Sequence, residues 1–199
     1  AFDRSELDIV VGSPWQDERV SQSPMLGRFR RHMIPYGVDT RVFKPTDKKE
    51  ARRRLGLPED AHVIAFRSAP FHRNFKGTSY IHDALRLFQP RRPTVLLVFE
   101  GVGGLDDLRE KYQFHELGWV IDGEKIAPGL QAADIFVMPS IAEAFGLMAI
   151  ESMACGTPPV VFDGTALPDT IGGSDCGVIV PQGDSNALAQ AIGDCLDNP

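Results

Sequence analysis

Cysteine is scarce in this sequence, and its few occurrences follow no recognisable spacing. Cys155, Cys176 and Cys195 are the three cysteines, and the sequence contains neither a CxxC pair nor a cluster of cysteine and histidine. An odd number without framework spacing argues against a disulfide scaffold, and the missing cluster argues against a zinc site. We therefore expect reduced thiols and a cytoplasmic location.

Long apolar runs and an excess of basic charge are also missing. The longest apolar run, residues 95–99, has only the length of a strand, and residues 1–11 carry too many charges for a signal peptide or a membrane span. The chain has 21 Lys and Arg against 27 Asp and Glu, a formal net charge of −6. Because nucleic-acid binding requires a basic surface, we expect no nucleic-acid partner. Membrane association is left open, since a domain outside this sequence could supply it.

What the sequence does contain is a regular alternation of strands and helices. Residues 135–138 are apolar on both faces, as a strand of a parallel sheet covered by helices requires. Strands are expected at residues 63–66, 95–99, 116–120, 135–138, 160–162 and 178–180, and helices at residues 47–55, 79–87, 105–112, 124–132, 146–153 and 186–196. This order predicts an α/β fold, a Rossmann-like doubly wound parallel sheet with helices on both faces and ligands at the carboxyl ends of its strands.

The first part of the chain does not fit that alternation. Residues 8–11 form a predicted strand, and a helix follows in which Ser13 and Gln16 make a capping box around Pro14. One strand and one helix cannot bury their own apolar sides, so they need a sheet outside this sequence or must dock on the domain that follows. We therefore interpret residues 1–30 as the tail of an N-terminal domain, residues 31–46 as a linker rich in Pro and Gly, and residues 47–199 as a C-terminal domain, and we expect the native protein to be longer.

An anion site is predicted where the strand at residues 135–138 ends. The free N–H groups of Phe145, Gly146 and Leu147 open the following helix, and the positive end of the helix dipole favours a diphosphate there. Gly146 lets the backbone approach a ligand closely, because no Cβ is in the way.

Two carboxylates flank this predicted cradle. Glu143 lies in the loop before the helix, and Glu151 lies inside the helix, beside its apolar face. A carboxylate in such surroundings must be paired or bind a ligand, because burying it alone is costly. A diphosphate cradle with two acceptors for hydroxyl groups is the description of a nucleotide-sugar site.

The motif Glu-Ala-Phe-Gly-Leu-Met-Ala-Ile-Glu at residues 143–151 resembles the signature of family 4 of the retaining glycosyltransferases, which have the GT-B fold. Further segments resemble the same family in order along the chain: residues 11–15, 34–45, 75–77, 133–140 and 177–181. The resemblance implies that residues 47–199 are the donor-binding half of such an enzyme, with the acceptor-binding half largely outside this sequence.

Site roles follow from the resemblance where residues match. Glu143 would contact the hydroxyls of the donor sugar, and Glu151 would hold the ribose hydroxyls. Lys76 and an arginine would neutralise the diphosphate leaving group. Arg67 is the preferred arginine and Arg73 the alternative.

The resemblance also implies the reaction. A glycosyl unit passes from a nucleotide-diphosphate sugar to an acceptor by front-face substitution, with retention and without a protein nucleophile, a cofactor or a required metal. The base would lie against backbone groups at Val120. The acceptor, a glycan, a lipid or a small molecule, would be bound mainly by the N-terminal domain, so this chain alone would be inactive. Alternatives are an epimerase-like isomerase of nucleotide sugars and a non-catalytic regulatory domain that only binds them.

Overall fold

A six-stranded sheet forms the centre of the computed structural model, which describes residues 5–68, 75–101 and 103–197. The strand order is β5-β4-β3-β6-β7-β8, and every neighbouring pair is parallel. The strands are β3 (His62–Arg67), β4 (Thr94–Phe99), β5 (Gln113–Gly118), β6 (Ile135–Met138), β7 (Pro159–Phe162) and β8 (Val178–Val180). The chain enters this sheet at the central strand β3, continues through β4 to the edge strand β5, and then builds the other half through β6, β7 and β8. The predicted doubly wound sheet is therefore confirmed.

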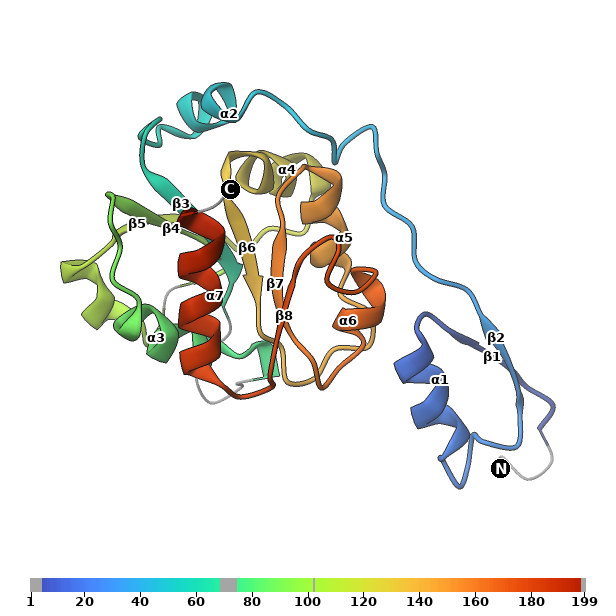
Figure 1. Ribbon diagram of the computed structural model, residues 1–199. Helices are drawn as coiled ribbons and strands as arrows, with labels where there is room; N and C mark the ends of the chain where they lie inside the picture. The colour runs from blue at the N-terminus through green and yellow to red at the C-terminus, as the bar shows by residue number, and fades with distance from the viewer. Residues whose placement is uncertain (1–4, 69–74, 102, 198–199) are drawn as a thin grey trace.

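Helices cover both faces of the sheet (Figure 1). They are α2 (Lys48–Leu55), α3 (Thr78–Leu87), the 3-10 helix η3 (Asp106–Glu110), α4 (Gly123–Ala132), α5 (Leu147–Ala154), α6 (Leu167–Thr170) and α7 (Ser185–Asp197). One face packs against α2, α4, α5 and α6, and the opposite face packs against α3, η3 and α7.

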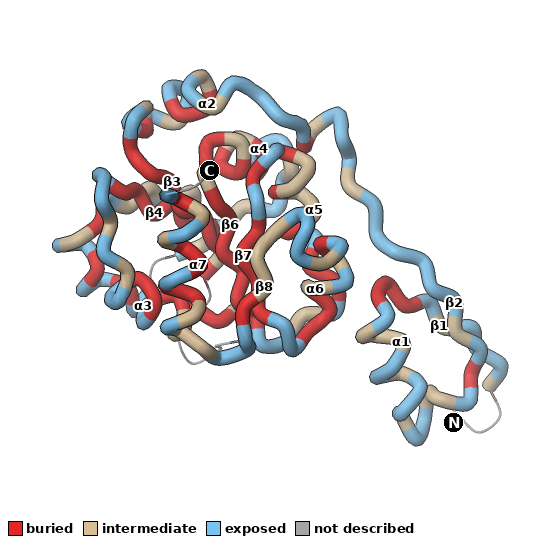
Figure 2. Tube along the Cα trace, in the orientation of Figure 1, coloured by how far each residue is buried: buried red, intermediate tan, exposed pale blue. Residues whose placement is uncertain are grey.

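The two-residue periodicity of the strands divides the core between these faces. Along β3, Val63 and Ala65 belong to the apolar cluster under α4, whereas Ile64 and Phe66 belong to the cluster under α7. All four side chains are fully buried. The inner strands β3, β4, β6 and β7 are therefore almost wholly buried, because both of their sides are covered (Figure 2).

Two predicted elements differ from the observed ones. The segment expected to be a helix at residues 105–112 forms only the short η3. Leu105, its N-cap residue, and Leu108 inside it are both buried, three residues apart, which is the repeat of a 3-10 helix. The strand expected at residues 116–120 ends at Gly118, where a φ of 69° turns the chain. Val120 therefore lies in the loop beyond β5.

A small N-terminal unit lies beside the main sheet (Figure 1). It consists of β1 (Asp8–Val11), α1 (Pro14–Ser21) and β2 (Arg30–Met33), and the two strands pair in parallel. The first residues of the predicted linker thus belong to a strand, while the limits proposed at residues 30 and 46 stay a prediction. Ser13 caps α1 as expected, accepting a hydrogen bond from the Gln16 N–H at 3.1 Å. Among the helices that the structure describes, none has the length and apolar character that crossing a membrane requires.

Candidate functional site

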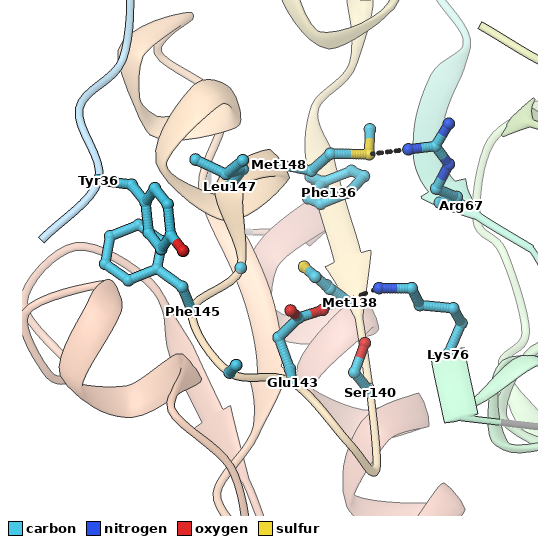
Figure 3. Close-up of a pocket in the computed structure, with 12 residues that line it drawn as sticks. Tyr36, Arg67, Lys76, Phe136, Met138, Ser140, Glu143, Phe145, Leu147 and Met148 are labelled. Carbon is cyan, nitrogen blue, oxygen red and sulfur yellow. Dashed lines mark hydrogen bonds and ion pairs between the residues drawn. The ribbon is translucent and has the colours of Figure 1, made fainter. Parts of the chain in front are cut away.

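A cavity of about 320 Å³ opens where β3 and β6 end and α5 begins (Figure 3). Parallel neighbours bring their carboxyl ends to the same edge of the sheet, so residues distant in sequence meet there. Six of the predicted site residues line the cavity: Arg67, Lys76, Glu143, Phe145, Gly146 and Leu147. Glu151 and Val120 lie outside this lining, and Arg73 lies outside the described residues.

Lys76 and Glu143 form an ion pair inside the cavity. The Lys76 Nζ donates to Glu143 Oε2 at 2.8 Å, and the side chains are only 26% and 17% exposed. The turn after Lys76 packs tightly on the end of β6, because a Cβ on Gly77 would come within 1.9 Å of the Pro139 carbonyl oxygen. This close approach holds the ammonium group beside a carboxylate 67 residues further along the chain.

Arg67 is the last residue of β3 and is held from several sides. Its Nη2 donates to the Val120 carbonyl at 2.8 Å, and its Nε lies 3.0 Å from Glu100 Oε2. The Nε–H is not aligned on that oxygen, so the contact with Glu100 is an ion pair without a regular hydrogen bond. The guanidinium carbon also lies 5.3 Å from the centre of the Trp119 ring. The arginine predicted for the diphosphate is therefore fixed on the Val120 side of the site.

The start of α5 has the open geometry of an anion cradle. Gly146 occupies the N-cap position with a φ of 98° and no side-chain cap, and the first N–H groups of a helix have no partner within it. A Cβ on Gly146 would lie 2.4 Å from a methyl carbon of Leu167, so the loop needs a glycine for both its conformation and its packing. Phe145 is nearly buried, and its carbonyl accepts from Thr170 Oγ1 at 2.6 Å.

Glu151 lies further along α5, one residue before the buried Ser152. Burial raises the pKa of its carboxyl, and the positive charge of Arg67 opposes that rise. Within the described parts of the chain, no donor lies at hydrogen-bond distance from this carboxylate. It has the properties of an acceptor kept available for a ligand.

Two contributors to the site were missed by sequence reasoning. Ser140 is fully buried, lines the cavity and has a hydroxyl without a hydrogen-bond partner among the residues described. Glu100 follows β4 directly, as Arg67 ends the neighbouring β3. The sequence could have identified both residues as candidates for the site, because each follows the carboxyl end of a predicted strand.

The expectation that no metal is needed stays a prediction. In residues 5–68, 75–101 and 103–197, no group of three or more His, Cys, Asp or Glu side chains is arranged to hold a metal ion.

The loop that carries Glu143 also touches the N-terminal unit and the segment that follows it. The Ser13 hydroxyl donates to the Ala144 carbonyl at 2.7 Å, and the rings of Tyr36 and Phe145 meet edge to face at 5.1 Å between centroids. Ser13 is 2% exposed and Tyr36 lines the cavity. Tyr36 therefore forms part of one wall of the cavity, and Ser13 holds the loop that carries Glu143.

Comparison with known proteins identifies the family. The family described as glycosyl transferases group 1 matches residues 61–198. A D-inositol 3-phosphate glycosyltransferase from Acidothermus cellulolyticus is 34% identical over 187 residues, which cover 84% of this chain and 41% of that protein. The chain thus spans less than half the length of this curated relative.

Solved structures agree with this assignment. A sucrose-phosphate synthase from Thermosynechococcus elongatus superposes with a TM-score of 0.80 at 30% identity, over 96% of this chain and 49% of that one. Anabaena Alr3699/HepE, solved in complex with UDP-glucose, superposes with a TM-score of 0.75 at 21% identity, over 98% of this chain and 55% of that one, a likeness of fold. The chain therefore belongs to the group 1 family of glycosyltransferases, and its sheet domain is the C-terminal domain of the GT-B fold, as its motifs predicted.

Proposed function

We propose that the cavity binds the diphosphate of a nucleotide sugar and that the whole protein transfers the glycosyl unit to an acceptor. The observation that carries this proposal is the convergence of Arg67, Lys76 and the amino end of α5 on one cavity. Two cations and a helix dipole that point at the same space favour a ligand with two or more negative charges.

Lys76 is the group best placed to act on the leaving diphosphate. In the donor-free protein its charge is balanced by Glu143 at 2.8 Å. A bound diphosphate would share the ammonium, and the ammonium would stabilise the charge that develops on the leaving oxygen. Glu143 would then be free to accept hydrogen bonds from the hydroxyls of the donor sugar.

The other donor contacts would be made around Arg67. Glu151, which has no hydrogen-bond or ion-pair partner among the described residues, would accept from the ribose hydroxyls. The base would lie against the backbone near Val120, whose carbonyl oxygen has a second lone pair beyond the one that accepts from Arg67. The complex of the Anabaena neighbour with UDP-glucose supports a nucleotide sugar as the class of ligand.

The same arrangement supports front-face substitution with retention. Glu143 is paired with Lys76 and is proposed to bind hydroxyls, so it is not assigned as a nucleophile, and no metal is assigned a role. The acceptor would be bound mainly by the N-terminal domain, and the reaction would take place in the cytoplasm.

Calorimetric titration with UDP, GDP, ADP and their sugars tests the donor site. We expect one nucleotide family to bind, and Lys76→Ala to weaken that binding about tenfold, because one charge-assisted contact is lost. Lys125→Ala, which removes an exposed lysine of α4, is the matched control and should bind like the wild type. Failure of every nucleotide and nucleotide sugar to bind, or equal affinity of Lys76→Ala and the wild type, would refute the assignment.

A further inference from the structure

Glu100 has a backbone conformation that a glutamate rarely adopts. Its φ is 76°, which makes it the non-glycine residue with a positive φ in the described chain. The conformation is locked from the backbone side, because the Glu100 N–H donates to the Gly118 carbonyl at 2.8 Å, where β4 and β5 end. Strain of this kind persists when the rest of the structure requires it, and it concentrates at functional sites.

Glycine would remove that strain, and glycine is abundant in the same turn. Gly101, Gly103 and Gly104 follow directly, yet the left-handed position itself holds a glutamate. A Cβ is therefore kept where the backbone favours its absence. The reason for a glutamate at this position must therefore lie in its side chain and not in the turn.

The Glu100 side chain reaches Arg67. Glu100 Oε2 lies 3.0 Å from the Arg67 Nε, and the two side chains are 20% and 22% exposed. The pairing follows from the sheet, because Arg67 lies opposite Phe99 in the parallel register of β3 and β4, and Glu100 is the next residue. With Val120 accepting from Nη2 and Trp119 beneath the guanidinium, Arg67 is held toward the loop after β5.

Arg67 is also near a second carboxylate. Glu151 interacts electrostatically with Arg67 and has no ion pair of its own in the part of the chain described. A guanidinium released from Glu100 would be drawn to Glu151 and would occupy the acceptor proposed for the ribose.

We propose that Glu100 is a positioning residue, which holds Arg67 toward the Val120 loop and so keeps Glu151 free for the donor. This inference rests on the donor site proposed above and adds a residue to it. Glu100 acts through Arg67 and touches neither the sugar nor the diphosphate.

Binding measurements on Glu100→Gly test the inference, with the nucleoside diphosphate that the wild-type chain binds best. We expect about tenfold weaker binding, because Arg67 is no longer held in place. We expect Glu100→Gln, which keeps an oxygen toward Arg67 without the charge, to give an intermediate loss. In an Arg67→Ala background, Glu100→Gly should weaken binding by less than about twofold, because the residue through which it acts is gone.

Thermal unfolding separates positioning from a merely structural role. Glycine relieves the left-handed backbone, so the unfolding midpoint of Glu100→Gly should be no lower than that of the wild type although its affinity falls. Glu110→Gln, an exposed carboxylate near the end of η3, is the control and should change neither quantity.

Two results would overturn the inference: wild-type affinity in Glu100→Gly, or an equal loss with and without Arg67. Failure of the underlying donor site is distinguishable from both, because in that case the wild-type chain itself binds no nucleoside diphosphate or nucleotide sugar.

Discussion

Charged side chains at this site differ in how their charges are balanced. Lys76 and Glu143 balance each other directly, and Arg67 is balanced by Glu100. For Glu151, the positive charge of Arg67 is the one influence among the described residues that offsets burial. A buried carboxylate that accepts no hydrogen bond lowers the stability of the folded protein, and ligand binding would offset that loss.

Replacement of that carboxylate should therefore stabilise the free protein and harm binding. Burial raises the Glu151 pKa above 4.5, so the folded state holds this proton more tightly than the unfolded chain. The stability that the group contributes is present below pH 4.5 and is lost as the pH rises through the raised pKa. At pH 7, Glu151→Gln should resist urea better than the wild type, while its affinity for the donor nucleotide falls about tenfold, because a charged acceptor is lost.

Urea unfolding from pH 4 to pH 8 measures the first effect, and calorimetry measures the second. The advantage of Glu151→Gln should grow with pH across the window above 4.5. A difference in unfolding free energy between Glu151→Gln and the wild type that stays the same at every pH would show that folding does not raise the pKa of this carboxyl.

Turns at the ends of elements shape the walls of the cavity. Gly77 opens α3 with a φ of 75° and packs against the end of β6, and Gly146 opens α5 with a φ of 98°. Each brings a backbone segment close to another element where a side chain has no room. The site thus depends on elements that meet more closely than a Cβ would permit.

Comparison of two glycines tests this dependence on close packing. Gly56 ends α2 with a φ of 68° and open space around its Cα, whereas a Cβ on Gly77 would meet the Pro139 carbonyl oxygen at 1.9 Å. We expect Gly56→Ala to cost about 1 kcal/mol, the strain of a left-handed residue alone. Gly77→Ala should cost more than about 3 kcal/mol, because backbone atoms must also move apart. Free energies of unfolding from guanidinium titrations measure both, and equal costs would show that the contact at Gly77 yields without penalty.

Two units make up the described chain, and they meet at the site. The apolar clusters of the sheet domain draw all their members from residue 38 onward, so this domain has its own core. The N-terminal unit contributes the hydrogen bond from Ser13 to the Ala144 carbonyl, and the segment that follows it contributes the contact between Tyr36 and Phe145. Loss of these contacts should therefore change the loop that carries Glu143 more than it changes the stability of the fold.

Removal of residues 1–37 tests this division. The shortened chain should unfold in one cooperative transition, because its core is intact. Its affinity for the donor nucleotide should fall about threefold, since the contacts that hold the loop around Ala144 are lost. Ser13→Ala in the 199-residue chain is the matched variant and should give part of the same loss. Loss of cooperative unfolding on truncation would show that the sheet domain needs the N-terminal unit to fold.

The sequence by itself determined the class of fold and the segment of the site. The strands at residues 135–138 and 178–180 and the helix begun by Gly146 follow from local apolar patterning and turn residues, and these need no knowledge of distant contacts. The two predicted elements that differ from the structure were also predicted from local patterns. Residues 105–112 have apolar spacing suited to either kind of helix, and the strand at 116–120 was extended past Gly118.

Tertiary structure alone decided how the site charges are paired. Lys76 meets Glu143 because β3 and β6 are neighbours, and Arg67 meets Glu100 because β3 and β4 run in parallel register. Neither contact is encoded by spacing along the chain, since the order of strands in the sheet determines which loops converge. Glu151 follows the same rule: its position on α5 could be read from the sequence, but its burial depends on what the folded sheet places around it.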